Sequence, residues 1–600
     1  MLRTFYLSFT GNFHNLLLAV IFLAGLTLSS ASPAILFSIC AIQGDAGVSP
    51  YLSQLVTVRG VVYADLDVTG QKGFFIQHED CDANPSTSDG IFIYTGQNLD
   101  LVNAGDLVKV TGWVNEYYGM TEISAYPQNV LVLSHANPLP LAHELNPPFD
   151  PVAAMSYFES LEGMYVSLAG GTAVGPTDLY DRTWLVRVDL GIARVFGDDP
   201  MGTGEIICAD DEGLYEIAPE VKVGDRVLGL AGVMDYRFES FCLEPLAEPV
   251  IIPEVRGFEL PRNSRSLIPP VFSVATFNLG NLFDKVDDPT SEDDVLTTTE
   301  YNRKLTKLAQ AIHGSLGEPA LLAIQEAENQ AVLTDLFARP EIQSMYGIVT
   351  EEGPDRRGLD IGIIYRQDLS QLVSYQVRQG CTHLVDGLGP DGNLNVSNPQ
   401  NTITCDSDGN GSLDGNRLFS RPPLVVRVNL CLPDCSQRTF PLTLVVNHWK
   451  SKTEDSGSVQ YTLPRRLEQA EFVAVLAEEI RNDDPLTPLL LLGDLNDVPG
   501  SAPLRMLENQ GFRDLVAQIP KTEQYSYIYE GISQALDHEW INLNPSFLPL
   551  SIFPIHINAD YPHALSLISN TPLRSSDHDA VLVEFCVFDR QVYLPFISIP

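Results

Sequence analysis

Short apolar runs alternate with polar residues along residues 38–140, and glycine or aspartate residues separate the runs. A period of two is typical of β-strands with one buried face. The runs LVTVRGVV, GFFIQ, IFIY and GDLVKVTGWV together predict a small β-barrel. The runs LEGMYV and GDRVLGLAGV repeat the pattern more weakly downstream, so we expect a second β module over residues 150–250.

The pattern changes after residues 251–270, a proline-containing segment with little periodicity that we interpret as a linker. Beyond it, runs with the spacing of an amphipathic helix alternate with short apolar runs that are typical of buried strands. The helical runs lie at 301–312 and 465–481, and the strand-like runs at 272–278, 320–325 and 489–492. This mixture predicts a layered α/β domain over residues 271–588, followed by an apolar tail at 589–600. A chain of 600 residues is too long for one core, which agrees with several domains.

Residues 1–31 have the features of an export signal. An apolar run spans Leu16–Leu28, and small residues follow it as in a cleavage zone. Arg3 supplies the one early positive charge, so an uncleaved membrane anchor stays an alternative. We therefore expect a protein that is secreted or held at the exterior of the cell envelope, with membrane contact only if the signal is uncleaved.

The nine cysteines fit an oxidising compartment, where disulfides form. Their positions suggest pairs without fixing the connectivity, and no CxxC pair points to zinc. The suggested pairs are Cys208 with Cys242, Cys381 with Cys405, and Cys431 with Cys435.

The formal net charge of −41 argues against tight, sequence-independent binding of nucleic acid by a broadly basic surface. Local phosphate contacts are compatible with this charge, because bound cations can offset the repulsion. The hydrophobic content of 44% and charged content of 19% are those of a globular protein rather than a disordered one.

Polar side chains suited to catalysis lie at the ends of apolar strands throughout the C-terminal half, most of them after a strand and Asp577 and His578 before one. They are Asn278, Glu326, His448, Asp494, Asn496, Asp537, Asp577 and His578. One polar residue at a strand end means little, because turns, helix starts and cores use the same residue types. Many such placements together point instead to a shared site. Carboxylate and amide oxygens suit a hard cation such as Mg²⁺, and a neutral histidine suits acid or base chemistry.

The ordered motifs FNLGN, IQEAEN, NHWKSK, GDLND and SDHDAV resemble those of the endonuclease/exonuclease/phosphatase superfamily, which includes DNase I-like nucleases, sphingomyelinases and inositol phosphatases. NHWKSK and the preceding β modules are most similar to a secreted bacterial endonuclease branch with an OB-like N-terminal domain. The resemblance covers residues 38–140 and 270–587. It implies a four-layer α/β/β/α sandwich of the DNase I-like type, preceded by one or two small OB-like β-barrel modules.

The resemblance also implies a divalent cation, Mg²⁺ or Mn²⁺, bound by oxygen ligands. Glu326 would bind the catalytic metal, and Asn278 and Asp577 would contribute to the same site. Asp494 and Asn496 would hold the metal, the scissile phosphate or the attacking water.

The resemblance assigns two catalytic histidines. His578, paired with Asp577, would polarise or protonate the phosphate, and His448 would be the second histidine. Asp537 would lie near the phosphate, and Asp360 would orient His448. The residues implied to contact substrate phosphates are Arg421 and Lys450. For Asp360 and these two basic residues, solvated surface charge stays an alternative.

Residues 406–417 read DSDGNGSLDGNR and match part of a Ca²⁺-binding loop. The matching ligand positions are Asp406, Asp408, Asn410 and Asp414, with Gly411 at the sharp turn. Arg417 stands where an EF-hand has its last glutamate, and flanking helices are not evident. A Ca²⁺ site and a solvated Asp/Gly loop are both open interpretations.

The combined prediction is a secreted, metal-dependent phosphodiesterase, foremost an endonuclease that hydrolyses DNA or RNA with a metal-activated water. The substrate partner is then nucleic acid, and no stable protein partner is expected. One alternative is a sphingomyelinase-like or other phosphate-ester hydrolase of the same superfamily. A second alternative is a non-catalytic extracellular binding protein on the same scaffold.

Overall fold

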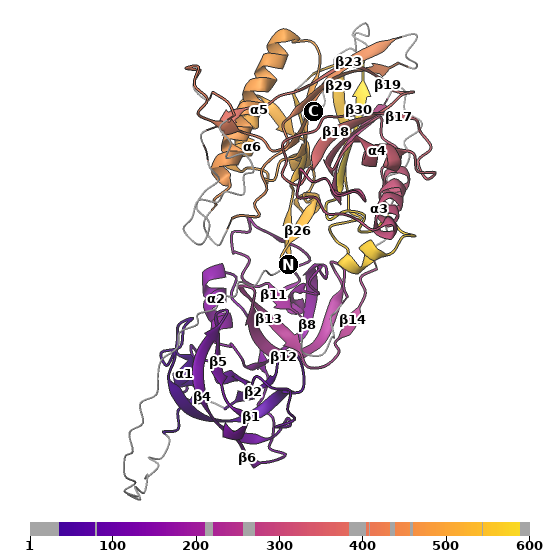
Figure 1. Cartoon of the computed structure of the whole chain (residues 1–600). Helices are drawn as coiled ribbons and strands as arrows, with labels where there is room; N and C mark the ends of the chain where they lie inside the picture. The colour runs from indigo at the N-terminus through magenta and orange to yellow at the C-terminus, as the bar shows by residue number, and fades with distance from the viewer. Residues whose placement is uncertain are drawn as a thin grey trace, which may run out of the picture.

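The computed structural model describes residues 35–78, 81–210, 220–255, 271–382, 384, 404–406, 409–432, 438–455, 460–542 and 544–588. The predicted export signal, most of the predicted linker, the apolar tail, Asp408 and Cys435 lie outside these residues. Within the described part, no helix is both long enough and apolar enough to cross a membrane. Two β-barrels form one end of the molecule, and a mixed α/β region forms the other (Figure 1).

The first barrel follows a short helix, α1 (Ile39–Gln43). Its strands are β1 (Leu55–Leu66), β2 (Gly73–Gln77), β3 (Gly90–Tyr94), β4 (Leu107–Tyr117), β5 (Met120–Ser124) and β6 (Val130–Ser134). They pair in the order β1-β2-β3-β5-β4-β6, and an additional pairing of β1 with β4 closes the barrel. Strand β3 runs parallel to β5. The alternating apolar residues of these strands form one buried core, as their period of two predicts.

The second barrel repeats this connectivity. Its strands are β7 (His143–Glu144), β8 (Tyr165–Gly175), β9 (Thr183–Arg187), β11 (Ile207–Ala209), β12 (Arg226–Arg237), β13 (Ser240–Pro245) and β14 (Val250–Ile252), and helix α2 (Pro151–Glu159) starts at an Asp150 cap. A pairing of β8 with β12 closes the order β12-β13-β11-β9-β8, and β11 runs parallel to β13. The weak sequence echo therefore corresponds to a second barrel with the same strand order as the first.

The predicted disulfides Cys208–Cys242 and Cys381–Cys405 are both present, and a third joins Cys40 to Cys81. Cys208 and Cys242 are register partners on β11 and β13, so this bond links that parallel strand pair of the second barrel. The third pair was not expected from the sequence.

The α/β region contains two six-stranded sheets. The first has the order β17-β18-β16-β15-β30-β29, and the second β19-β22-β23-β24-β28-β25. Their strands are β15 (Val271–Leu282), β16 (Leu321–Ala327), β17 (Tyr346–Thr350), β18 (Asp360–Arg366), β29 (Phe547–Ile555), β30 (Ala580–Val587), β19 (Ser370–Val377), β22 (Leu424–Cys431), β23 (Thr439–His448), β24 (Leu489–Asp494), β25 (Phe512–Asp514) and β28 (Asp537–Asn542). One buried apolar cluster takes residues from both sheets, so the sheets pack face to face.

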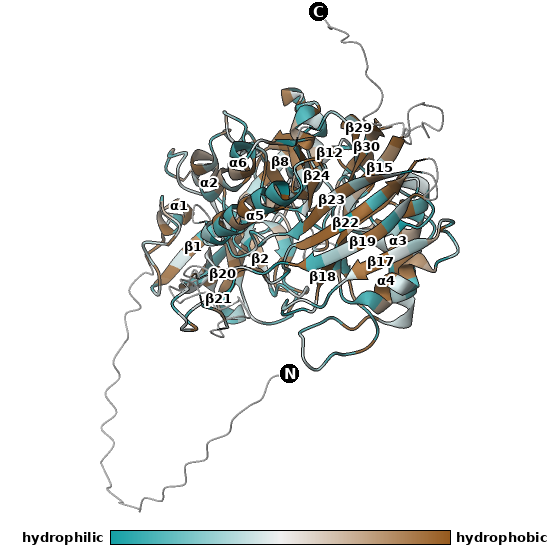
Figure 2. Cartoon of the chain, turned by 90° about the horizontal axis from the view of Figure 1, so that it is seen from above, coloured by the Kyte–Doolittle hydropathy of each residue, from teal (hydrophilic) through white to brown (hydrophobic). Residues whose placement is uncertain are grey.

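Helices cover the outer faces of these sheets. Helices α3 (Thr298–Gln310) and α4 (Gln330–Phe337) pack on the first sheet, and α5 (Leu463–Asp483) and α6 (Ala502–Asn509) pack on the second. A capping box between Thr297 and Glu300 begins α3. Figure 2 shows predominantly hydrophobic strands β22, β23 and β24 beside the more hydrophilic surface of α5. The mixed α/β class predicted from the sequence is confirmed.

Two small sheets complete the structure. Strands β20 (Cys381–Thr382) and β21 (Asn416–Arg417) form one pair. Strand β10 (Val195–Phe196), from the second barrel's part of the chain, pairs with the hairpin of β26 (Tyr527–Tyr529) and β27 (Ile532–Gln534). This three-stranded sheet joins the barrels to the α/β region.

Candidate active site

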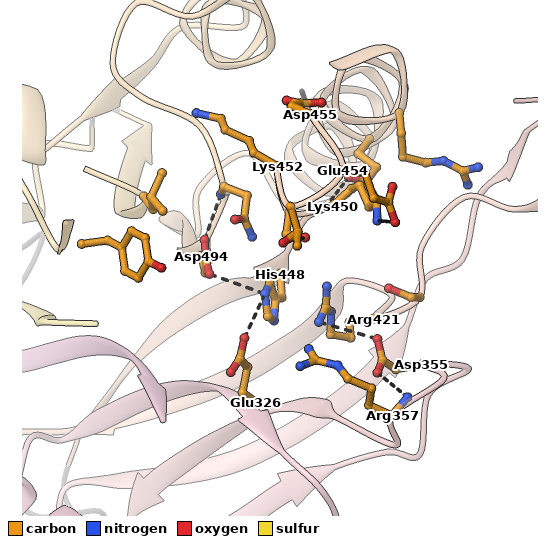
Figure 3. Close-up of a pocket in the computed structure, with 18 of the residues that line it drawn as sticks. Glu326, Asp355, Arg357, Arg421, His448, Lys450, Lys452, Glu454, Asp455 and Asp494 are labelled. Atoms are coloured by element: carbon orange, nitrogen blue, oxygen red, sulfur yellow. Dashed lines mark hydrogen bonds and ion pairs between the residues drawn. The ribbon is translucent and has the colours of Figure 1, made fainter. Parts of the chain in front are cut away.

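A cleft of about 890 Å³ opens where strands of the two large sheets end. Eight of the residues predicted for the site lie along its wall: Glu326, Arg421, His448, Lys450, Asp494, Asn496, Asp577 and His578. These side chains come from segments up to some 250 positions apart in the chain. They meet because they lie at or near strand ends of the two packed sheets. Figure 3 shows His448 between Glu326 and Asp494, with Arg421 on the same side of the cleft.

Glu326 reaches the cleft through an irregularity in β16. The register between β16 and β18 shifts between Gln325 and Ala327, and Glu326 has a φ of 61°, in the left-handed region. Such a bulge re-aims one side chain at the end of a strand. The Glu326 Oε2 atom accepts a hydrogen bond from the Asn281 amide at 2.8 Å, which leaves Oε1 toward the cleft.

His448 ends β23 and lies between two carboxylates. Its Nε2 atom is 3.9 Å from Glu326 Oε1 and 3.5 Å from Asp494 Oδ2. Burial lowers the pKa of His448 well below its ordinary value, and the nearby charge of Arg421 lowers this pKa further. The buried Nδ1 atom has no hydrogen-bond partner among the described residues. His448 is therefore neutral at pH 7.

Asp494 ends the adjacent parallel strand, β24, and is fixed by two amides. Its Oδ2 atom accepts a hydrogen bond from Asn278 Nδ2 at 3.0 Å, and its Oδ1 atom accepts one from the Asn496 backbone amide at 2.9 Å. Burial and the nearby Asp537 carboxylate raise the pKa of Asp494 above its ordinary range. Asn278 does not line the cleft; it supports Asp494 from behind. Asn496 in turn donates a hydrogen bond to the Trp449 carbonyl at 3.1 Å.

His578 forms a buried pair with Asp537, the first residue of β28. The His578 Nδ1 atom lies 2.7 Å from Asp537 Oδ2, which also accepts a 2.7 Å hydrogen bond from the Ser526 hydroxyl. Burial alone would lower the pKa of His578, but the Asp537 carboxylate outweighs it and raises the pKa well above the ordinary value. The two histidines of the cleft thus favour opposite protonation states. Asp537 itself does not line the cleft; it contacts His578, which does.

Asp577 is half-buried and lies beside positive charge. Burial would raise its pKa, but His578, Arg574 and Lys304 together lower the pKa below its ordinary value. A side chain at Gly280, where φ is 64°, would lie 2.8 Å from Asp577 Oδ1. The glycine of the FNLGN motif therefore lets the backbone approach Asp577 closely.

Basic side chains gather along the cleft although the chain is strongly acidic. They are Arg356, Arg357, Arg421, Lys450, Lys452 and Arg465. Arg421 lies 3.6 Å from Asp355, and its buried Nε atom has no partner among the described residues. Lys450 donates a 2.8 Å hydrogen bond to Glu454. Arg421 and Lys450, both predicted to bind phosphate, thus each line the cleft beside an acidic partner.

Asp360 does not orient His448, which corrects the sequence-based assignment. Its Oδ1 atom accepts a 2.7 Å hydrogen bond from the Gly353 amide, whereas His448 Nδ1 lacks a partner among the described residues. Burial, together with the nearby Glu352 and Asp355, raises the pKa of Asp360 to about 8. Asp360 begins β18, a strand away from the one that carries Glu326, and it does not line the cleft. The acid that orients a histidine in this site is Asp537.

The predicted Ca²⁺ loop lies outside the cleft lining, and its Asp408 is outside the described residues. The Asp406 carboxylate accepts hydrogen bonds from the amides of Gly409, Asn410 and Gly411 at 2.6 to 3.2 Å. Asn410 Oδ1 accepts one from the Ser412 amide, and the Asp414 amide bonds to the Cys405 carbonyl. Such bonds also occur in an ordinary Asp/Asn turn, so the Ca²⁺ site stays a prediction.

The donor set of the cleft suits a hard divalent cation. Glu326 Oε1 and Asp494 Oδ2 face the same imidazole nitrogen, and Asp537 Oδ1 is buried without a partner among the described residues. Crowded carboxylate oxygens that raise one another's pKa are stabilised when a cation binds between them. Asp494, Asp537 and His578 also form a cluster with ligand atoms within 4.8 Å, but its His578 and Asp537 already bond to each other. We therefore favour Glu326 and Asp494 as the residues that would hold the ion.

Four contributors to the site were missed from the sequence. Ser526 holds Asp537, Asn281 holds Glu326, and Tyr527 packs its ring 4.7 Å from the ring of His578. Arg357 donates a 3.0 Å hydrogen bond to Asn281 Oδ1. Asn281 lies within the FNLGN motif and was within reach of motif reasoning. The other three occur in segments whose sequence has no catalytic pattern.

Two parts of the chain match family models. Residues 273–386 match the Endonuclease/Exonuclease/phosphatase family, and residues 132–256 match a domain of unknown function (DUF8508). The first match begins in β15 and includes Asn278, Glu326 and Asp360. No curated protein matches the sequence.

Solved structures resemble about half of the chain at low identity. One is an endonuclease/exonuclease/phosphatase family protein from Bacteroides thetaiotaomicron, at 16% identity, covering 54% of this chain and 100% of that chain with a TM-score of 0.33. Another is a mannosyl-6-phosphatase from the same species, at 17% identity, 53% and 100% coverage and a TM-score of 0.32. A third is a humanized D. rerio TDP2, at 14% identity, 52% and 98% coverage and a TM-score of 0.33. These values are low, so the likenesses carry no weight for the activity of this chain.

Proposed function

We propose that the protein is a secreted, metal-dependent phosphodiesterase, and foremost an endonuclease that hydrolyses DNA or RNA, because residues 273–386, which supply Glu326 to the cleft, match the Endonuclease/Exonuclease/phosphatase family. The superfamily match supports a phosphoester hydrolase in general. The finer assignment rests on the chemistry of the cleft.

One observation carries the proposal: two histidines lie in one cleft, His448 Nε2 at 3.5 Å from Asp494 and 3.9 Å from Glu326, and His578 Nδ1 at 2.7 Å from Asp537. The lowered pKa of His448 favours a neutral ring that accepts a proton, whereas the raised pKa of His578 beside Asp537 favours a protonated ring that donates one. Groups whose environments push their pKa values apart are a signature of paired acid and base roles. A binding protein without catalysis has no need of this separation, so the cleft favours an enzyme over the non-catalytic alternative.

Glu326 and Asp494 would hold Mg²⁺ or Mn²⁺, with Asn278 keeping Asp494 in place and Asp577 contributing nearby. When bound, such an ion supplies charge for the phosphoryl oxygens and lowers the pKa of a coordinated water. The chain's own groups perform the remaining tasks. His578 donates a hydrogen bond or a proton to the phosphate, and Asn496 and Asp494 orient the polar groups of the reacting centre.

The distribution of charge supports a polyanionic substrate. Six of the residues that line the cleft are lysine or arginine and seven are aspartate or glutamate, so the lining is far less acidic than a chain whose formal net charge is −41. Positive charge placed locally in an acidic protein guides phosphates into the cleft while the rest of the surface repels them. Arg421 and Lys450 would contact backbone phosphates on either side of the scissile one.

The finer architecture also belongs to this proposal. Two sheets packed face to face with helices outside would be the four-layer α/β/β/α sandwich of DNase I-like enzymes. The two closed barrels, each with its third strand parallel to its fifth, would be OB-like modules. Three disulfides among the described residues are compatible with the proposed secretion.

Purified protein should be incubated with circular plasmid, linear DNA, RNA and sphingomyelin vesicles, each with Mg²⁺, Mn²⁺, Ca²⁺ or EDTA. We expect plasmid nicking that EDTA abolishes and that the His578→Ala variant lacks. Release of phosphocholine alone would favour the sphingomyelinase-like alternative. No cleavage of any phosphodiester under all these conditions would reject the proposed function.

A further inference from the structure

The part of the chain that forms the second barrel adds one strand to the small sheet that borders the cleft. Strand β10 pairs in parallel with β27, with Val195 opposite Ile532 and Phe196 opposite Ser533. The hairpin that β10 extends carries Tyr527, Tyr529 and Gln534, all of which line the cleft. In Figure 1, β26 lies where the barrels meet the α/β region. A segment outside the superfamily match is therefore built into the site's border.

The tip of this hairpin fits closely against the second barrel. Glu530 and Gly531 both have positive φ, 49° and 78°, as a two-residue type I′ turn requires. A side chain at Gly531 would lie 2.8 Å from the Trp184 side chain on β9. This close fit fixes the position of the hairpin relative to the barrel, so we expect a displacement of one to move the other.

Arg194, immediately before β10, is the polar centre of this contact. Its side chain is only 6% exposed. The guanidinium donates hydrogen bonds to Ser533 Oγ at 2.9 Å, to the Tyr525 hydroxyl at 2.9 Å and to Asp560 Oδ1 at 2.8 Å. It also lies 3.6 Å from the centre of the Tyr525 ring. A buried arginine with this many partners fixes the segments that it bonds.

A short chain of contacts leads from Arg194 to His578. Tyr525 is followed by Ser526, whose hydroxyl bonds to Asp537 and whose carbonyl accepts a 2.7 Å hydrogen bond from the Asp579 amide. Asp537 bonds to His578 Nδ1. By fixing Tyr525, Arg194 therefore also fixes the next residue, Ser526. Ser526 in turn holds Asp537, the acid partner of His578, and the backbone amide of Asp579, which follows His578.

A second branch reaches the same backbone. The Tyr525 hydroxyl donates a 2.9 Å hydrogen bond to Asp560, and its ring stacks on His556 at 3.8 Å. His556 Nδ1 lies 2.9 Å from Asp579 Oδ2. Both branches end next to His578, whereas Arg194 itself does not line the cleft.

We propose that Arg194 is a positioning residue through which the second barrel sets the geometry of the Asp537–His578 pair, an inference that rests on the proposed phosphodiesterase function. The barrel is then a required part of the catalytic unit rather than an independent binding module. Loss of Arg194 releases Tyr525 and Ser526, so His578 loses its orientation while the cleft keeps its phosphate-binding groups.

The test compares full-length wild type with Arg194→Met, Arg194→Lys, Ser526→Ala and the Arg194→Met/Ser526→Ala double variant. Lys521→Ala is the matched control, because Lys521 pairs with Asp198 at 2.8 Å in the same interface but is about half exposed and leads to no cleft residue. Plasmid nicking with Mg²⁺ gives kcat and KM, and thermal unfolding reports stability. We expect Arg194→Met to lower kcat about tenfold to a hundredfold with KM changed less than about twofold, since small displacements of a catalytic group have effects of this size. Arg194→Lys should recover part of the loss.

The double variant separates positioning from general destabilisation. If Arg194 acts through Ser526, the double variant has a kcat close to that of the worse single variant. The proposal is overturned if the kcat losses of the two single variants multiply in the double variant. It is also overturned if Arg194→Met has the same kinetics as Lys521→Ala. If the wild type is inactive on every phosphodiester, the proposed function is rejected instead. The positioning role of Arg194 is then tested by the histidine ring NMR spectrum, which needs no enzymatic turnover. The His578 signal, assigned with His578→Ala, should shift in Arg194→Met and stay in place in Lys521→Ala; an unshifted signal overturns the proposal.

Discussion

Replacing Asp537 with asparagine tests the most specific feature of the site. Asp537 is fully buried, and its Oδ2 atom is 2.7 Å from His578 Nδ1. Asparagine keeps the shape of the side chain and an oxygen that accepts from Ser526, but it removes the negative charge. His578 then loses the partner that fixes its ring and raises its pKa. The reaction loses a correctly oriented, protonated imidazole in the transition state.

The size of the effect follows from the role assigned to His578. General acid catalysis by a positioned side chain contributes about 10²- to 10⁴-fold to a rate. We therefore expect kcat for plasmid nicking to fall by about 10²- to 10⁴-fold, which corresponds to about 3 to 5 kcal/mol of transition-state stabilisation. KM should change little, because the basic residues of the cleft are untouched.

The chain offers a matched control for this substitution. His538 Nδ1 lies 3.0 Å from Asp514 Oδ2 in a second buried Asp–His pair, which does not line the cleft. Asp514→Asn repeats the same chemical change at similar burial, so it reports the cost of disturbing a buried pair without catalysis. It should lower the unfolding temperature while kcat stays within about threefold of wild type. If Asp537→Asn keeps a kcat as high as Asp514→Asn does, His578 is not the proton donor and the assignment fails.

Three further predictions concern the metal, the substrate and the pH. Glu326→Gln should raise the Mg²⁺ concentration that gives half-maximal nicking at least about tenfold, which a metal titration measures; an unchanged titration would place the ion elsewhere. Arg421→Ala should raise KM for DNA about tenfold with kcat nearly unchanged, because it removes a charge-assisted phosphate contact; steady-state kinetics that show a kcat effect alone would contradict this role. Burial alone would lower the pKa of His556, but Asp579 and Glu523 outweigh it and raise the pKa to about 9. The ion pairs of His556 therefore stabilise the fold fully below the unfolded pKa of about 6.5 and lose up to about 3 kcal/mol as the pH rises through about 9. Urea unfolding of wild type and His556→Gln at pH 6 and pH 10 should show this difference shrinking, and a constant difference would show that His556 is uncharged in the fold.

The sequence predicted elements well where one physical cause dominated. The period-two runs of residues 38–140 became strands, and the apolar runs at 320–325 and 489–492 became β16 and β24, because side-chain burial alone specifies such segments. The convergence of Glu326, His448, Asp494 and His578 was predicted from motif order and is present in one cleft. Their roles in catalysis stay a prediction.

Other features depend on contacts that no local pattern encodes. The bulge that aims Glu326 results from a register shift against β18, and strand periodicity carries no trace of it. Asp360 was assigned to His448 by the superfamily resemblance, which places an acid on a neighbouring strand, yet its carboxylate accepts a hydrogen bond from Gly353. Ser526 and Arg194 occur in segments without a recognisable motif. Ser526 bonds to Asp537, and Arg194 bonds to Ser533 and Asp560 across more than 300 positions of the chain.

The contrast between the two histidines explains why the site draws on so many separate segments. A neutral His448 requires burial, an unpartnered Nδ1 atom and a nearby arginine, whereas a protonated His578 requires a buried carboxylate at hydrogen-bond distance. Both conditions must hold within one cleft, where a carboxylate between the two rings would raise the pKa of both histidines. Asp537 meets the second condition through its contact with His578 Nδ1, and the Ser526 hydroxyl holds Asp537 in place. Because Ser526 is fixed through Tyr525 by Arg194, the protonation state of the catalytic pair depends on a residue from the preceding barrel. The two parts of the chain therefore have to be treated as one functional unit.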